Sequence, residues 1–453
     1  MRQLFMITAI MMTSFVYINE IIESAVFLHI SYIMAWLMLI SGLLFARRFT
    51  RILCLSLLAL SSFITFFYKI PLAGIFAGVA MVIPLVILFM LVPFISIAIR
   101  RGGYLVSLNY YIKAYAESPK SFYALVTGVV FTLGSVMNMV SVRVVHDILE
   151  ESRLPEDFLL RSYTTGFVSS MVWSPFFTGV TLAVTYAEVR LATFMPYALL
   201  YAAGIYLLGL IVYKSDRKGQ HKLSLSLQAI EIKEQIHSHT AARKLRMLLI
   251  NLAFLLMLVL AGERIIPFSS IMYIVSFISV AYGMVWLYTV TDIKTWVQDV
   301  SNYRLRIIQM VNEMVFFLTV GILAAAISLS PLQSYVQSFF LGIAETSTIL
   351  LITSIILSMV FFAAFGISQV ATITVLGNVL QASAIGLTPV AYALTFMAGW
   401  ALSAITSPFV AFNMILRELL GYHPFAIAFR HNIAFKLLFL GLSVIFIRLL
   451  TIL

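Results

Sequence analysis

The stretch Gly166-Phe-Val-Ser-Ser-Met-Val-Trp-Ser-Pro-Phe176 has a second copy, Gly399-Trp-Ala-Leu-Ser-Ala-Ile-Thr-Ser-Pro-Phe409. Both have the form Gly-x3-Ser-x3-Ser-Pro-Phe, and matched positions differ by one offset of 233 (399 − 166, 403 − 170 and 407 − 174). A spacing of four places the glycine and both serines on one helix face. The proline lacks an N–H and interrupts that helix. Each copy lies in an apolar run without Lys, Arg, Asp or Glu, so the pattern predicts two broken helices inside a membrane.

The composition around these stretches is that of a polytopic membrane protein. Of 453 residues, 62% are hydrophobic and only 10% are charged, a balance that water-soluble domains do not have. The net charge of +11 does not indicate a nucleic-acid partner, because the basic residues sit in short loops beside apolar runs. Membrane lipid is therefore the expected surrounding partner, and the chain is expected to be all-α.

Known catalytic patterns are missing from the sequence. The single cysteine, Cys54, excludes a disulfide within the chain and a cysteine metal cluster. There is no His-Glu-x-x-His spacing, no phosphate-binding Walker loop and no Gly-x-Ser-x-Gly elbow. We therefore expect no enzyme, no metal site and no cofactor other than a coupling Na⁺ or H⁺.

The apolar runs and the loops between them predict two repeats. Basic loops belong on the cytoplasmic side of a cell (inner) membrane, which makes the N-terminus cytoplasmic. The predicted parts are an extra N-terminal helix (1–24), repeat 1 (25–213, with scaffold 25–99 and transport part 122–187), a cytoplasmic loop (214–246) and repeat 2 (247–453, with scaffold 247–329 and transport part 346–416).

The charged ends of matched segments predict that the repeats are inverted. Segment 71–99 ends at the basic pair Arg100-Arg101, whereas its counterpart 308–329 follows a basic stretch. The two segments then cross the membrane in opposite directions. This topology holds if 122–149 and 347–381 are re-entrant hairpins. The sequence leaves open whether these two segments span the membrane instead.

Polar residues gather at the expected hairpin tips and helix breaks. The tip at Gly134 aligns with the tip at Gly366, an offset of 232 (366 − 134). Broken helices expose N–H groups that suit anions and carbonyls that suit cations. The alternative is that these side chains join helices or satisfy their own backbone. The candidate substrate- or ion-binding residues are Ser135, Asn138, Ser170, Ser174, Thr178, Ser368, Gln369, Thr372, Ser403, Thr406, Ser407 and Asn413.

Two charged residues are candidate coupling groups. Glu313 lies early in a spanning segment, where it either takes up protons or simply sits at the inner interface. Arg143 follows the first tip, where it either binds an anionic substrate or emerges at the inner face.

This order of scaffold helices, hairpin with a polar tip, broken helix and closing helix, present twice, resembles the ion transporter superfamily. That group includes divalent anion/sodium symporters and arsenite- or citrate-permease-like carriers. The resemblance covers most of 25–453 and rests on Gly134-Ser135-Val-Met-Asn138 with Ser174-Pro175, and on Gly366-Ile-Ser368-Gln369 with Ser407-Pro408. It implies a homodimer in which a transport domain moves past a fixed scaffold. Neither tip carries an intact Ser-Asn-Thr motif.

The sequence thus predicts a secondary-active symporter of a small anionic solute that works by elevator-like alternating access. One alternative is a flippase or exporter of a lipid-linked envelope precursor. Another is a channel or a membrane scaffold that transports nothing.

Overall fold

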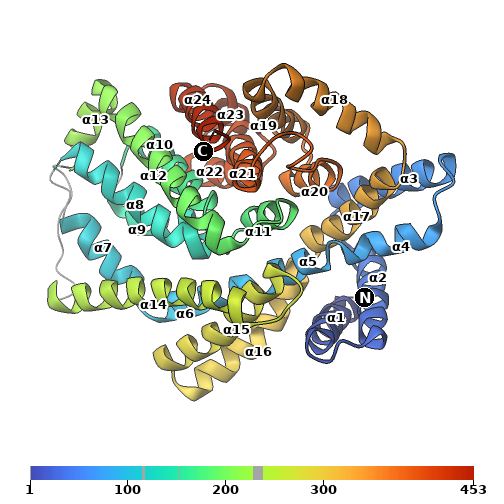
Figure 1. Cartoon of the computed structure of the whole chain (residues 1–453). Coiled ribbons are helices and arrows are strands. Elements are labelled where there is room, and N and C mark those ends of the chain that lie inside the picture. The colour runs from blue at the N-terminus through green and yellow to red at the C-terminus, as the bar shows by residue number, and fades with distance from the viewer. Residues whose placement is uncertain (1, 115–117, 153, 228–237, 453) are drawn as a thin grey trace. The chain divides into compact units, whose positions relative to one another are not determined.

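The computed structural model describes residues 2–114, 118–152, 154–227 and 238–452. All regular secondary structure in these residues is helical (Figure 1), which confirms an all-α membrane protein. Eleven helical segments are long and apolar enough to cross a membrane. The predicted loop 214–246 is described only in part, because 228–237 lies outside the described residues.

The contacts divide the chain into two compact units. The first unit consists of Met1–Ile97, Leu258–Glu345 and Val370–Ile385, and the second of Ala98–Met257, Thr346–Gln369 and Gly386–Leu453. Two helices continue through the unit boundaries, namely α6 (Ile95–Arg101) and α14 (Ser238–Ile265). The other helices of the first unit are α1 (Arg2–Ile22), α2 (Ala25–Phe45), α3 (Arg48–Phe67), α4 (Leu72–Ala80), α5 (Ile83–Leu91), η1 (Val92–Phe94), α15 (Ile271–Val290), α16 (Ile293–Gln309), α17 (Val311–Ser328), α18 (Leu332–Thr346) and α20 (Gln369–Val379). Those of the second unit are α7 (Tyr104–Ala114), α8 (Pro119–Met137), α9 (Val140–Leu149), η2 (Glu150–Ser152), α10 (Glu156–Met171), α11 (Thr178–Tyr186), α12 (Leu191–Ser215), α13 (Arg217–Leu227), α19 (Thr348–Ala364), α21 (Pro389–Thr406), α22 (Ala411–Leu420), α23 (Pro424–Phe429) and α24 (Ile433–Leu450).

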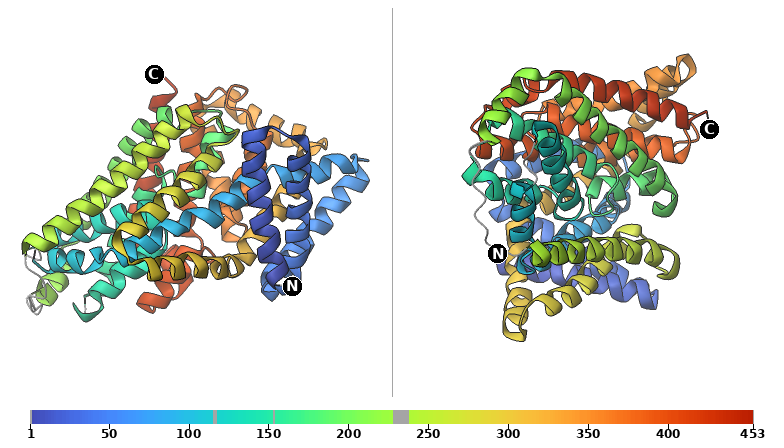
Figure 2. Two further views of the ribbon diagram at one scale, coloured as in Figure 1. Left: turned by 90° about the horizontal axis from the view of Figure 1, so that it is seen from below. Right: turned by 90° about the vertical axis from the view of Figure 1, so that its left-hand side faces the viewer.

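The N-terminal helix α1 is packed into the first unit. It lies beside α2 (Figure 2). The Tyr17 hydroxyl donates to the Tyr273 carbonyl at 3.1 Å. Glu20 accepts from the Ser269 hydroxyl at 2.7 Å. The helix outside the predicted repeats is therefore an integral part of this unit.

In the first unit, α4 crosses α17 through a pair of glycines. A Cβ at Gly321 would lie 2.5 Å from the Gly78 carbonyl oxygen, so only glycine permits this approach. Beyond the candidate span formed by α15, Asp292 caps α16. Its carboxylate accepts from the Thr295 N–H at 3.0 Å and from the Thr295 hydroxyl at 2.7 Å. These two bonds lower the pKa of Asp292.

The second unit repeats one pairing of helices. The long helix α8 packs against α10, and in the same way α19 packs against α21. In the first pair, the Tyr123 hydroxyl on α8 lies 2.9 Å from the Thr165 hydroxyl on α10. The Tyr123 ring also stacks on Tyr213 of α12, with 4.1 Å between the ring centroids. In the second, α19 has 17 residues, about 25 Å at 1.5 Å per residue, which is shorter than a bilayer core of about 30 Å. The re-entrant course of 122–149 and 347–381 stays a prediction.

Candidate functional site

Both Ser-Pro stretches interrupt a helix and form the same turn. The first interruption separates α10 from α11, and the second separates α21 from α22. In each, the serine hydroxyl accepts from the N–H two residues further on: Phe176 to Ser174 at 3.3 Å, and Phe409 to Ser407 at 3.2 Å. The hydroxyl thereby takes over an N–H that the proline break has released from the helix.

The same two serines also join each break to the end of an earlier helix, α8 for the first break and α19 for the second. The Ser174 hydroxyl donates to the Ser135 carbonyl, and the Ser407 hydroxyl donates to the Ala363 carbonyl at 2.6 Å. Both serines are completely buried. Each acceptor lies in the last turn of a helix, where carbonyls lack partners within the helix. Each hydroxyl thus bonds to two backbone groups and joins a break to the end of an earlier helix, although the Ala363 carbonyl also accepts from the Gly366 N–H at 2.9 Å.

The predicted hairpin tips each contain a residue with a positive φ. Asn138 has φ 53° and Gly366 has φ 82°, both in the left-handed region. Each follows its carbonyl acceptor by three residues, so Asn138 corresponds to Gly366, an offset of 228 (366 − 138). This correspondence differs by one helical turn from the alignment of Gly134 with Gly366, which matches glycines and not the acceptor carbonyls.

We expect the two tips to respond differently to substitution. Gly366→Val should lower the stability of the protein by about 1–2 kcal/mol, the cost of a left-handed residue with a side chain. Asn138→Gly should be neutral or stabilising, because glycine removes strain but loses the Met139 N–H bond to the Asn138 side chain at 2.8 Å. Thermal unfolding of the purified variants measures both effects. Equal destabilisation in both variants would contradict the shared conformation.

The Gly-x3-Ser face of each broken helix packs against its hairpin helix. A Cβ at Gly166 would lie 2.5 Å from the Thr127 carbonyl, and Gly134 faces Ser170 across the same interface. In the second repeat a Cβ at Gly399 would lie 2.5 Å from the Met359 sulfur. The glycines therefore allow each broken helix to approach its hairpin closely.

Within the second unit the two broken helices also contact each other. The rings of Phe167 on α10 and Phe412 on α22 stack at 4.5 Å with an interplanar angle of 5°. Gly179 on α11 faces Met397 and Trp400 on α21. Helices on both sides of one break thus pack against helices on both sides of the other. The duplicated stretches form one buried cluster.

Four other candidate hydroxyls are bonded within their own helices. Ser170 donates to Phe167, Ser403 to Trp400, Thr406 to Leu402 and Ser135 to Thr132, all to backbone carbonyls at 2.7–2.8 Å. Local bonding of this kind is the alternative that the sequence left open. These hydroxyls still have acceptor capacity, and their assignment as ligands stays a prediction.

The remaining candidates include two incompletely bonded amides. Asn413 is fully buried and donates to the Ser407 carbonyl at 2.8 Å, but its Oδ1 has no partner among the described residues. The Nε2 of Gln369, in a residue only 7% exposed, likewise has none there. Thr178 opens α11, Ser368 follows the second tip, and Thr372 lies on α20 in the first unit.

The two charged candidates have different surroundings. Arg143 forms a bidentate ion pair with Glu418, so α9 is linked to α22 and the arginine charge is already balanced. Glu313 is in the first unit and exposed in the first turn of α17, where a carboxylate complements the helix dipole. A coupling role for either residue remains a prediction.

Sequence reasoning missed the partners of the anchoring serines. They are backbone carbonyls of Ser135 and Ala363, which carry no side-chain signal. It also missed Glu418 as the partner of Arg143. Their spacing of 275 residues gives no local pattern from which the pair could be predicted.

Comparisons with known proteins support the class of fold. No protein-family profile matches the sequence, and no curated protein matches it significantly. The crystal structure of the Alcanivorax borkumensis YdaH transporter, reported with an unusual topology, aligns with a TM-score of 0.57. The alignment covers 87% of this chain and 96% of that one at 14% identity. The chain therefore has the fold of a multi-pass membrane transporter.

Proposed function

We propose that this protein is a secondary-active transporter of a small anionic solute, coupled to Na⁺ or H⁺. The observation that carries the proposal is the duplicated Ser-Pro break, whose buried serine bonds in each copy to a carbonyl at the end of an earlier helix. Helix interruptions of this kind supply the binding sites of many secondary transporters. The protein acts in the cell membrane, with its N-terminus cytoplasmic, as a homodimer.

The helix starts after the two breaks support an anionic solute. Both α11 and α22 begin just beyond a Ser-Pro turn, and the first N–H groups of a helix have no partners within it. These N–H groups and the helix dipole favour negative charge. The unbonded Gln369 amide donor adds a neutral group that can bind a carboxylate or similar oxygen.

The burial of the cluster supports alternating access over an open channel. Ser174, Ser407 and Asn413 are completely buried. A solute reaches them only when the packing around the breaks opens. We propose that 122–187 and 346–416 move in an elevator-like way, while 25–99 and 247–329 stay fixed.

Solute-dependent stabilisation tests this proposal. Purified protein should be screened by thermal unfolding against small organic and inorganic anions, with and without Na⁺ and at two pH values. We expect at least one anion to raise the unfolding temperature, and the rise to depend on Na⁺ or on pH, because a ligand that binds only the folded state stabilises it. Flux far above carrier rates in liposomes would instead establish a channel, and no stabilisation by any anion would oppose the proposed site.

A further inference from the structure

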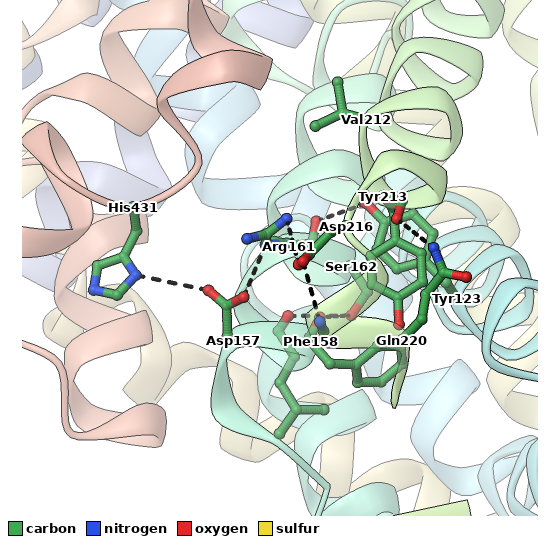
Figure 3. Close-up of polar contacts among 12 residues, drawn as sticks. Tyr123, Asp157, Phe158, Arg161, Ser162, Val212, Tyr213, Asp216, Gln220 and His431 are labelled. Carbon is green, nitrogen blue, oxygen red and sulfur yellow. Dashed lines mark hydrogen bonds and ion pairs between the residues drawn. The ribbon is translucent and has the colours of Figure 1, made fainter. Parts of the chain in front are cut away.

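A polar cavity lies in the second unit, and none of its lining residues belongs to the two Ser-Pro stretches. Its volume is about 290 Å³. It is lined from the start of α10, from the junction of α12 with α13, and from the turns on both sides of α23 (Figure 3). We call it the Arg161 cavity, after the arginine in its wall.

A chain of ion pairs fixes one wall of the Arg161 cavity. Arg161 lies 2.9 Å from Asp157 and 3.1 Å from Asp216. Asp157 also lies 3.7 Å from the His431 ring nitrogen, and Asp216 accepts from the Gly219 N–H at 3.1 Å. Figure 3 shows Asp157 and Arg161 on α10, with Asp216 and His431 reaching them from other segments. The arginine is held in place, and two carboxylates already balance its charge.

The remaining charged groups of the lining are cationic. Lys218 and Lys222 line the cavity from one face of α13, at positions i and i+4. Neither lysine has a carboxylate partner among the described residues. Three full positive charges therefore face two negative ones in the lining. The excess charge favours an anion.

Tyr213 gives an independent indication of a ligand. It lines the cavity and is only 2% exposed. Its ring stacks on Tyr123, but its hydroxyl has no hydrogen-bond partner among the described residues. Buried hydroxyls are normally bonded, and an unbonded one destabilises the protein. A ligand oxygen in the cavity would complete its bonding.

We propose that the Arg161 cavity binds a phosphate group, through Lys218, Lys222 and the Tyr213 hydroxyl. Phosphate offers several acceptor oxygens to an ammonium pair and a phenol. The cavity lies at the end of the candidate span formed by α12, where basic residues commonly meet anionic lipid headgroups. The phosphate belongs either to such a headgroup or to a free ion, and the proposal is independent of the transported solute.

Titration of the full-length protein in detergent tests the site. The probes are dihexanoyl-phosphatidylglycerol, dihexanoyl-phosphatidylcholine and inorganic phosphate, and the readout is the thermal unfolding temperature. The test variants are Tyr213→Phe and the double variant Lys218→Gln/Lys222→Gln. The matched control is Lys214→Gln/Arg217→Gln, which removes the same charge from the same stretch but not from the cavity lining.

We expect phosphatidylglycerol to stabilise the parent protein and the control. In Tyr213→Phe its apparent Kd should rise about tenfold, the effect of one lost bond to a charged group. Without ligand, the same variant should unfold at an equal or higher temperature, because an unbonded buried hydroxyl is gone. Stabilisation by inorganic phosphate as well identifies a free ion as a source. Equal loss in the control variant, or no effect of Tyr213→Phe on binding, overturns the proposal.

Discussion

Replacing Ser174 by valine should reduce solute uptake at least about a hundredfold. The substitution releases the break, and displacing a binding group by about 1 Å has effects of that size. Valine carries two methyl groups in place of the hydroxyl and donates no hydrogen bond. The Ser135 carbonyl then loses its partner, and the N–H of Phe176 loses its acceptor. The break is no longer fastened to the hairpin tip. The protein should still insert into the membrane, because the change adds only apolar surface.

Ser407→Val should have a similar effect, because the Phe409 N–H loses its acceptor and the break loses its bond to the Ala363 carbonyl, which keeps the Gly366 N–H. Uptake of the solute found by the unfolding screen, measured in proteoliposomes, compares both variants with the parent. Ser162→Ala is the matched control. Ser162 is equally buried on α10, but its hydroxyl bonds only to carbonyls of its own helix, at 3.0 and 3.1 Å. Normal uptake by both valine variants would remove the assignment of the site to the breaks.

Gly166→Ala should destabilise the protein by about 2–3 kcal/mol, in the range for overpacked cores. The added methyl group would lie 2.5 Å from the Thr127 carbonyl and 2.7 Å from the Val130 Cβ, so α8 and α10 must separate. The equivalent Gly399→Ala should cost less, since its nearest neighbour is the flexible side chain of Met359.

Gly204→Ala on α12 is the control for this prediction, and its effect on stability should have the opposite sign. Its Cβ would make only ordinary contacts, 3.6 Å from Leu442 at the nearest. Alanine should therefore stabilise the helix by about 0.5–1 kcal/mol. Chromatographic recovery of folded protein after stepwise heating ranks the three variants. A Gly166→Ala variant as stable as Gly204→Ala would contradict the close crossing of α8 and α10.

The membrane class and the two helix breaks could be predicted from the sequence, because they depend on local chemistry. Long apolar runs, basic loops and a proline after Gly-x3-Ser-x3-Ser each act within a few turns of helix. The correspondence between Asn138 and Gly366 could not be predicted, because the two residues share a positive φ but differ in type. The partner of Arg143 and the acceptors of Ser174 and Ser407 depend on tertiary packing, which no spacing records.

The division of the chain shows a similar limit. Hydropathy separates membrane segments from loops, but it does not say which segments pack together. The structure groups 370–385 with the first unit and Thr346–Gln369 with the second, within a stretch that has no charged residue between Thr346 and Leu416.

The path from tip to break differs in length between the two halves. Ser135 and Ser174 are 39 residues apart, whereas Ala363 and Ser407 are 44 apart. The three-residue step from acceptor carbonyl to left-handed residue is the same in both. The difference of five residues (44 − 39) therefore lies in the connecting segment and not at the turn. An alignment of the two halves with a single offset would match the two breaks but not the two residues of positive φ.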